Sequence, residues 1–170
     1  MPTSRLILEN IGELVTCEPR LADASDASAS KVGLIANACV VVEDDRIVWV
    51  GKQADFDSSP FEPAHRIDVS GSAVLPGFID CHTHTVFAGN RDHEYEMRVS
   101  GATYMEIAES GGGINATVMA VRDSSEERLF ELGLARLRAM IRSGTTTVEI
   151  KSGYGLSLED ELKMLRVIRR

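Results

Sequence analysis

The feature that most constrains the fold is a short segment, residues 75–89, which reads LPGFIDCHTHTVFAG. A Pro-Gly pair lies near its start, and a short apolar run then ends in the alternating residues Asp80, His82 and His84. Successive side chains of a β-strand point to opposite faces, so these three share one face. Two neutral imidazoles side by side can bind one metal ion, and imidazole nitrogen suits Zn, Fe or Ni. The segment therefore predicts a strand that ends in a metal-binding pair, although a solvated strand end would show the same spacing.

The segment also resembles a family signature. Members of the amidohydrolase superfamily carry PGxIDxHxH on the first strand of their barrel, and the matching residues here are Pro76, Gly77, Ile79, Asp80, His82 and His84. The resemblance implies a (β/α)8, TIM-like barrel with a mononuclear or binuclear metal site. In such barrels the active site lies at the C-terminal ends of the strands, which is where the two histidines would sit.

Composition limits the kinds of partner that the chain could have. Its 170 residues carry a formal net charge of −8, which argues against nucleic acid, whose binders carry basic patches. No apolar stretch is long enough to cross a membrane as a helix. The cysteines Cys17, Cys39 and Cys81 are odd in number and unrelated in spacing, so we expect free thiols. The cysteine pattern therefore predicts a protein of the reducing cytoplasm.

The length of the chain is short for the fold that the signature implies. A complete (β/α)8 barrel needs about 250 residues, and the residues after 73 supply only about two βα units. We therefore expect an α/β chain in which residues 1–72 form a small β-module and residues 73–170 form the first, incomplete portion of the barrel. The resemblance implies that the β-module is part of a composite β-sandwich completed by the far C-terminus of family members. The chain then corresponds to the N-terminal portion of a larger protein, and by itself we expect it to fold poorly and to lack hydrolase activity.

The first part of the chain shows the pattern of strands and turns. Residues 5–16 predict a strand followed by a turn, and residues 38–50 predict a hairpin around an acidic turn. A further short strand is expected at 66–69. Residues 17–36 are rich in Ala, Ser and Asp and predict a mobile loop or insertion.

The second part alternates helical and strand patterns. Residues 91–110 predict two short helices, and residues 124–144 predict a long helix with Ser124 and Glu127 as a capping box and Gly144 as its stop. Its apolar stripe predicts a core-facing side and comprises Leu129, Leu132, Leu137, Met140 and Ile141.

A β-branched strand and another helix follow this long helix. Residues 145–150 predict the strand, and Ser157 is expected to cap the helix. We expect the buried face of that helix to consist of Leu158, Leu162, Leu165 and Ile168. The succession of strand, helix, strand and helix is typical of an α/β fold.

Three further segments narrow the resemblance. Residues 91–104, 106–117 and 144–156 are similar to the imidazolonepropionases, a family of amidohydrolases. This resemblance implies hydrolysis of a cyclic amide, 4-imidazolone-5-propanoate, to N-formimino-L-glutamate in histidine degradation. It also implies one Zn or Fe ion held by His82 and His84, with the remaining ligands and the general base beyond Arg170. A homodimer of the whole enzyme is compatible with it.

The substrate implied by the resemblance carries a propionate group, so its site needs a carboxylate binder. Arg is suited to that role because it is permanently charged and can donate two parallel hydrogen bonds to a carboxylate. The resemblance places Arg91 at the substrate, together with Tyr154 and Tyr104. Without it, Arg91 would be interpreted as a surface charge and Tyr154 as a turn tyrosine at the edge of the core. Lys151 is interpreted as structural.

Two alternatives differ from this interpretation. The His-x-His strand would also fit another cyclic-amide hydrolase or deaminase of the superfamily, such as a dihydroorotase-like or cytosine-deaminase-like enzyme. The second alternative is a non-catalytic, truncated chain, because catalytic zinc usually has three protein ligands and only two are identified here.

Overall fold

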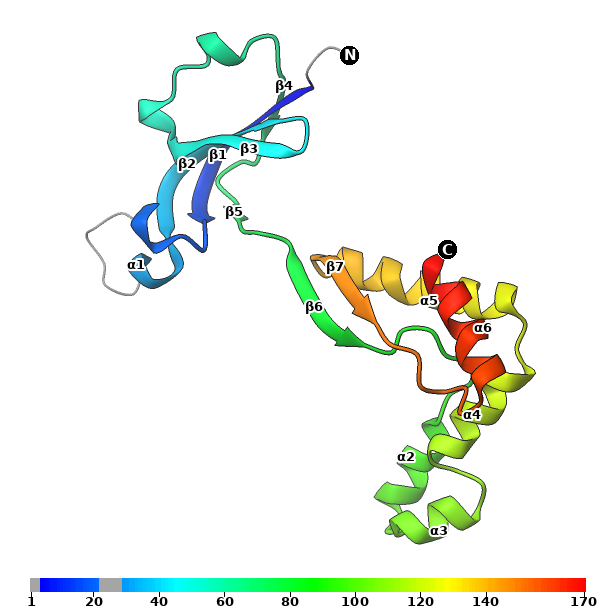
Figure 1. The fold of residues 1–170 in the computed structure, drawn as a ribbon. Helices are drawn as coiled ribbons and strands as arrows, with labels where there is room; N and C mark the ends of the chain where they lie inside the picture. Colours follow the sequence, from blue (N-terminus) through cyan, green and yellow to red (C-terminus); the bar gives the residue numbers. More distant parts are fainter. Residues whose placement is uncertain (1–3, 22–28) are drawn as a thin grey trace. The chain divides into compact units, whose positions relative to one another are not determined.

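The structure is a computed structural model that describes residues 4–21 and 29–170. The chain divides into two compact units, Met1–Pro76 and Gly77–Arg170 (Figure 1). The first unit is a β-sheet module and the second alternates strands with helices, so the prediction of an α/β chain is confirmed.

The first unit is a mixed five-stranded sheet. Strand β1 is antiparallel to β2 and parallel to β4 and β5, and β3 pairs with the far side of β2. The strands are β1 (Arg5–Val15), β2 (Leu34–Glu43), β3 (Arg46–Lys52), β4 (His65–Asp68) and β5 (Ala73–Val74). The predicted strands at 5–16 and 66–69 and the hairpin at 38–50 are confirmed.

The prediction of a loop over 17–36 is wrong at both of its described ends. The 3₁₀ helix η1 (Pro19–Leu21) and the short helix α1 (Ala29–Val32) lie within it, and β2 already begins at Leu34; residues 22–28 lie outside the described part. The physical reason is pairing with β1, in which Ile35 lies opposite Leu14 and is buried. The polar composition of the neighbouring residues obscured this start of the strand.

The two faces of this sheet have different surroundings. One face buries Ile7, Cys39 and Val41, and Trp49, Phe56 and Phe61 pack against it from β3 and from the segment with the 3₁₀ helices η2 (Gln53–Asp55) and η3 (Ser59–Phe61). The other face buries a second cluster and lines an open apolar groove of about 340 Å³. Its buried residues are Ile11, Leu14, Ile35, Ala38 and Val40.

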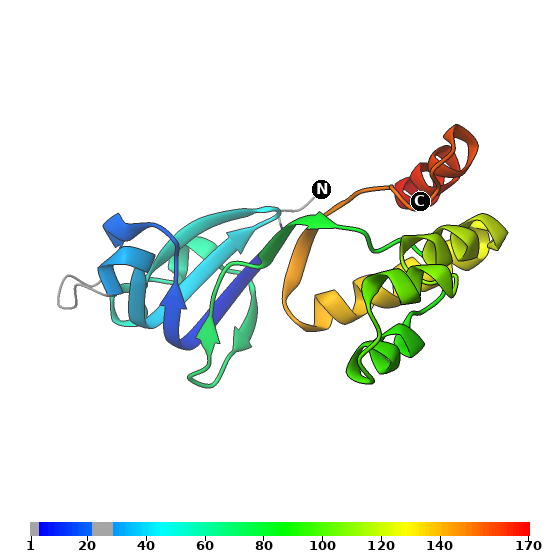
Figure 2. The same ribbon diagram turned by 90° about the horizontal axis from the view of Figure 1, so that it is seen from below.

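The second unit is built on two parallel strands. Strands β6 (Phe78–Thr83) and β7 (Thr145–Ile150) pair side by side, and the crossover between them is helical (Figure 1, Figure 2). The helices are α2 (Asp92–Val99), α3 (Tyr104–Glu109), α4 (Ile114–Asp123) and α5 (Glu126–Arg142), and α6 (Leu158–Arg169) follows β7. The strand at 145–150 and the two short helices in 91–110 are confirmed, whereas α4 was not predicted.

The start of α5 differs from the prediction by one residue. Ser125, not Ser124, is the N-cap, and its hydroxyl accepts a hydrogen bond from the backbone N–H of Arg128. Ser124 instead ends α4, where its hydroxyl donates to the carbonyl of Ala120 at 2.7 Å. The error arises because α4 ends and α5 begins at two adjacent serines, and the hydroxyl of either serine could act as an N-cap. Gly144 follows the C-cap with φ of +94°, as predicted for the stop.

The core of the second unit gathers residues from three helices and from the loop after β6. Its buried residues are Val86, Ala88, Val121, Leu129, Met164 and Val167. The predicted inner face of α6 is therefore wrong at three of its four residues: Leu158, Leu162 and Leu165 are exposed, whereas Met164 and Val167 face the core. The fourth predicted residue, Ile168, packs against this core. Helix α6 carries two apolar stripes, so periodicity alone could not show which one faces inward. Ile141 of α5, also predicted to lie in the core, is 65% exposed.

Candidate functional site

The two histidines lie at the C-terminal end of β6. His82 is the penultimate residue of the strand, and His84 directly follows the last one. The centroids of the two imidazole rings are 5.6 Å apart. The neighbouring strand fixes this end, because the Thr83 hydroxyl donates to the carbonyl of Glu149 at 2.7 Å and the Lys151 N–H donates to the carbonyl of Thr83 at 2.8 Å. The pair thus lies where parallel βα units carry their functional groups.

The surroundings of His84 fit a metal ligand. Its Nδ1 atom is buried and has no hydrogen-bond partner among the described residues. A buried polar atom without a partner is uncommon in native structures and points to a missing ligand. Within the same described part of the chain, no group of three or more His, Cys, Asp or Glu side chains is arranged to hold a metal. The pair would therefore supply part of a ligand set.

Tyr154 lies beside this pair, on the loop between β7 and α6. Its ring centroid is 5.4 Å from that of His84 and 6.1 Å from that of Phe87. A Cβ at Gly153 would make only ordinary van der Waals contact with Cε1 of His84, at 3.4 Å, but the φ of this residue is +133°. Such a backbone conformation is essentially restricted to glycine.

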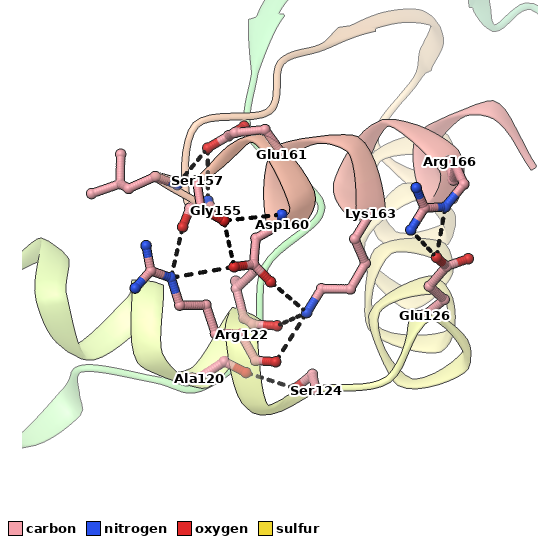
Figure 3. Close-up of polar contacts among 12 residues, drawn as sticks. Ala120, Arg122, Ser124, Glu126, Gly155, Ser157, Asp160, Glu161, Lys163 and Arg166 are labelled. Carbon is pink, nitrogen blue, oxygen red and sulfur yellow. Dashed lines mark hydrogen bonds and ion pairs between the residues drawn. The ribbon is translucent and has the colours of Figure 1, made fainter.

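The loop that carries Tyr154 is held from α6 by Glu161 (Figure 3). Oε1 of Glu161 accepts the backbone N–H groups of Gly155 and Leu156, each at 2.8 Å. Burial acts to raise the pKa of this carboxyl, but hydrogen bonds from Ser152 and from the loop N–H groups outweigh burial and lower it. Leu156 has φ of +51°, a left-handed conformation that costs a non-glycine residue about 1–2 kcal/mol. Glu161 thus stabilises a loop conformation that is unfavourable by itself.

A second set of contacts holds the same loop from α4 (Figure 3). Nε of Arg122 donates to the carbonyl of Gly155 at 2.8 Å and lies 3.4 Å from Oδ2 of Asp160. Nζ of Lys163 donates to the carbonyls of Val121 and Arg122, each at 3.0 Å. The position of Tyr154 is therefore fixed by side chains of two helices.

Arg91 lies immediately before α2 and is paired with Glu94. Its Nε donates to Oε1 of Glu94 at 2.8 Å, and its Nη2 donates to Oε2 at 2.5 Å. The Glu94 carboxylate is buried, and Oε1 also accepts the backbone N–H of Gly113 at 2.7 Å. Chiefly because of the Arg91 hydrogen bonds, the pKa of Glu94 falls from 4.5 to about 2.

The structure places the three predicted substrate-binding residues on three different segments. The pKa of the Arg91 guanidinium is raised chiefly by its hydrogen bonds to Glu94. Tyr154 lies against His84, and Tyr104 begins α3 and is 65% exposed. Lys151 forms an ion pair with Glu149 at 2.8 Å.

Sequence reasoning assigned no role to Glu94 or Glu161. Arg91 and Glu94 are three residues apart at the start of a helix, and this spacing could have indicated their ion pair. The contacts of Glu161 with the loop and of Glu94 with Gly113 join segments that no local pattern connects.

Comparison with known proteins identifies relatives by sequence. No protein-family model matches the chain. The chain is 52% identical over 136 residues to an imidazolonepropionase of Acinetobacter baumannii, an alignment that covers 80% of this chain and 33% of that protein. It is 50% identical over 149 residues to an imidazolonepropionase of Shewanella pealeana, which covers 88% of this chain and 36% of that protein. The corresponding enzyme of Yersinia pseudotuberculosis is 50% identical over 137 residues, with 81% and 33% covered.

Solved structures share the fold at low sequence identity. A variant of triazine hydrolase superposes with a TM-score of 0.61 at 17% identity, over 98% of this chain and 33% of that chain. A Xaa-Pro dipeptidase with bound methionine gives a TM-score of 0.52 at 20% identity, over 90% and 28% of the two chains. At these identities the likeness shows a shared fold. Among the described residues, none of the helices has the length and apolar character needed to span a bilayer.

The sequence relatives carry the name of the family that residues 91–104, 106–117 and 144–156 resembled. Over most of its length the chain is therefore similar to imidazolonepropionases, and it spans about a third of the length of the curated relatives it matches.

Proposed function

We propose that the whole protein hydrolyses 4-imidazolone-5-propanoate to N-formimino-L-glutamate, a step in histidine degradation. The proposal rests on one group of side chains that lie close together in the second unit. This group contains the His82 and His84 pair, the unpartnered Nδ1 of His84, and Tyr154 against the same ring. The name of the relatives supports the choice of substrate.

We further propose that His82 and His84 hold one Zn or Fe ion together with ligands from other parts of the whole protein. When bound, such an ion lowers the pKa of a water molecule to about 7 and makes it a nucleophile. The chain's own contribution at this point is proposed to be orientation, because the centroid of the Tyr154 ring lies 5.4 Å from that of His84. Imidazole orientation is a recognised determinant of metal affinity.

The substrate's propionate is assigned to Arg91, with Tyr104 and Tyr154 as hydroxyl donors. A guanidinium can donate two parallel hydrogen bonds to a carboxylate and thereby fix its direction as well as its charge. The half-exposed guanidinium of Arg91 and the place of Tyr154 beside His84 support these assignments. Their task would be to hold the ring so that its amide carbonyl faces the histidines.

The finer architecture is also a proposal. We assign residues 73–170 to the first βα units of a (β/α)8 barrel, which the parallel pair β6 and β7 with its helical crossover supports. Residues 1–72 are assigned to a composite β-sandwich, and the open apolar groove on one face of the first sheet supports a missing second layer. The free thiols fit a location in the reducing cytoplasm. The homodimer stays a prediction.

The proposal is tested on the whole protein with both histidines changed to Ala. We expect His82→Ala/His84→Ala to lose bound Zn or Fe by elemental analysis and to lose hydrolysis of imidazolonepropionate. His65→Ala, on an exposed position of β4, is the matched control and should keep both. Full metal content and activity in the double variant would refute the ligand assignment. Turnover of dihydroorotate or cytosine, with none of imidazolonepropionate, would favour the alternative enzymes of the superfamily.

A further inference from the structure

We infer that Glu94 is a positioning residue for substrate specificity, which fixes the Arg91 guanidinium so that its unused edge faces the carboxylate of the substrate. This inference rests on the proposed function, in which Arg91 binds the propionate. It concerns a buried side chain to which nothing in the sequence pattern assigned a role.

The argument begins with the hydrogen-bond capacity of a guanidinium. Arg91 has five N–H groups, and the side-on pair with Glu94 uses the one on Nε and one on Nη2. Across residues 4–21 and 29–170, no protein group accepts a hydrogen bond from Nη1. The edge formed by Nη1 and the second N–H of Nη2 is therefore available, and it has the geometry for a second carboxylate.

The position of Glu94 is itself fixed by the fold. Its side chain is 4% exposed, whereas that of Arg91 is 39% exposed. The carboxylate also accepts the N–H of Gly113, so it joins the start of α2 to the turn before α4. A Cβ at Gly112 would lie 3.0 Å from Oε1 of Glu94 and 2.8 Å from Ile107. The glycine run at 111–113 thus allows backbone to approach the carboxylate closely.

Two opposing effects of Glu94 on substrate binding can be compared. Its negative charge weakens the net attraction of Arg91 for a second carboxylate, but it also holds a long, half-exposed side chain in one orientation. Immobilising such a side chain on binding costs about 0.5–1.5 kcal/mol. A guanidinium that points in another direction also loses its paired hydrogen bonds to the substrate carboxylate. We take orientation to be the larger of the two effects, so Glu94 is expected to tighten binding of the propionate.

The test is a double-mutant cycle on the whole protein. We expect Glu94→Gln to raise KM for imidazolonepropionate on the order of tenfold, about 1.4 kcal/mol, with kcat little changed. In an Arg91→Ala background the same substitution should add nothing, because the residue acts only through Arg91. The methyl ester of the substrate, which lacks the carboxylate, should be insensitive to Glu94→Gln. Glu96→Gln, exposed on the same helix, is the control that should leave KM unchanged.

A second variant keeps the test decisive if Glu94→Gln does not fold. Arg91→Lys preserves the positive charge, but its ammonium group cannot form a bidentate pair with a carboxylate. This substitution should therefore raise KM in the same way as Glu94→Gln. An unchanged KM in Arg91→Lys, or additive effects of Glu94→Gln and Arg91→Ala, would overturn the inference while leaving the proposed function intact. No turnover of imidazolonepropionate by the wild-type whole protein would instead overturn the proposed function, and the inference with it.

Discussion

At the scale of single residues, the chain keeps a buried negative charge by surrounding it with donors. The Glu94 carboxylate receives two hydrogen bonds from Arg91 and one from Gly113. Burial alone would raise the pKa of this carboxyl, but the hydrogen bonds from Arg91 and Gly113 lower it. The charged form is therefore the stable form of this residue in the folded state.

The lowered pKa of Glu94 gives a pH dependence of stability with a definite sign. Because the folded pKa, about 2, lies below the ordinary value of 4.5, the carboxylate stabilises the fold above pH 4.5. This contribution is lost as the pH falls from 4.5 to about 2. We expect the thermal unfolding midpoint of wild type to exceed that of Glu94→Gln at pH 7, and the difference to shrink through this window. A difference that stays constant from pH 5 to pH 2 would contradict the assignment.

The residues of the candidate site were predictable to different degrees. The alternation of His82 and His84 is local, so their place at a strand end followed directly from the sequence. Tyr154 between two glycines could be assigned to a loop for the same reason. The roles of Glu94 and Glu161 depend on backbone groups of other segments, which become neighbours only through the fold.

At the scale of elements, adjacent serines between α4 and α5 have different tasks. Ser125 satisfies a free N–H at the start of α5, whereas the Ser124 hydroxyl is bonded to a carbonyl within α4. We expect Ser125→Ala to lower the free energy of unfolding by about 1 kcal/mol, the usual effect of losing an N-cap. Ser124→Ala, the matched control, should change it by no more than about 0.5 kcal/mol. Equilibrium urea unfolding of both variants measures this, and the reverse ranking would show that the helix begins one residue earlier.

Element boundaries were predictable where the pattern was regular. Strand β7 is a run of β-branched residues and was predicted without error, and Gly144 marks the end of α5 as expected. Helix α4 was missed because a run of glycines precedes it and hides its start. The inner face of α6 was misassigned because only the packing of α5 and the loop after β6 decides which stripe is buried.

At the scale of the whole molecule, large apolar side chains remain exposed in both units. Ile47 of the first unit is 69% exposed, and Ile79 and Leu158 of the second are 72% and 79% exposed. Sequence composition could not indicate this, because it reports how many apolar residues exist and not which of them find partners. Extensive apolar exposure is typical of surfaces that contact other protein.

We expect the isolated 170 residues to self-associate for this reason. Size-exclusion chromatography with light scattering should show species larger than the monomer. Leu158→Glu/Leu165→Glu, which places charges on the exposed stripe of α6, should shift the distribution towards the monomer. A monodisperse monomer of the unchanged chain over a wide range of concentrations would contradict the expectation.

The contact between Lys163 and the end of α4 has a consequence for the order of events during synthesis. The last carbonyls of a helix have no partner within it, and here two of them are bonded by a side chain 41 and 42 residues later. At about 5–20 residues per second, a ribosome adds that stretch in roughly 2–8 s. For those seconds the end of α4 is held by Ser124, whose N–H and hydroxyl donate to the carbonyls of Val121 and Ala120, and the bonds from Lys163 are added only once α6 is being translated.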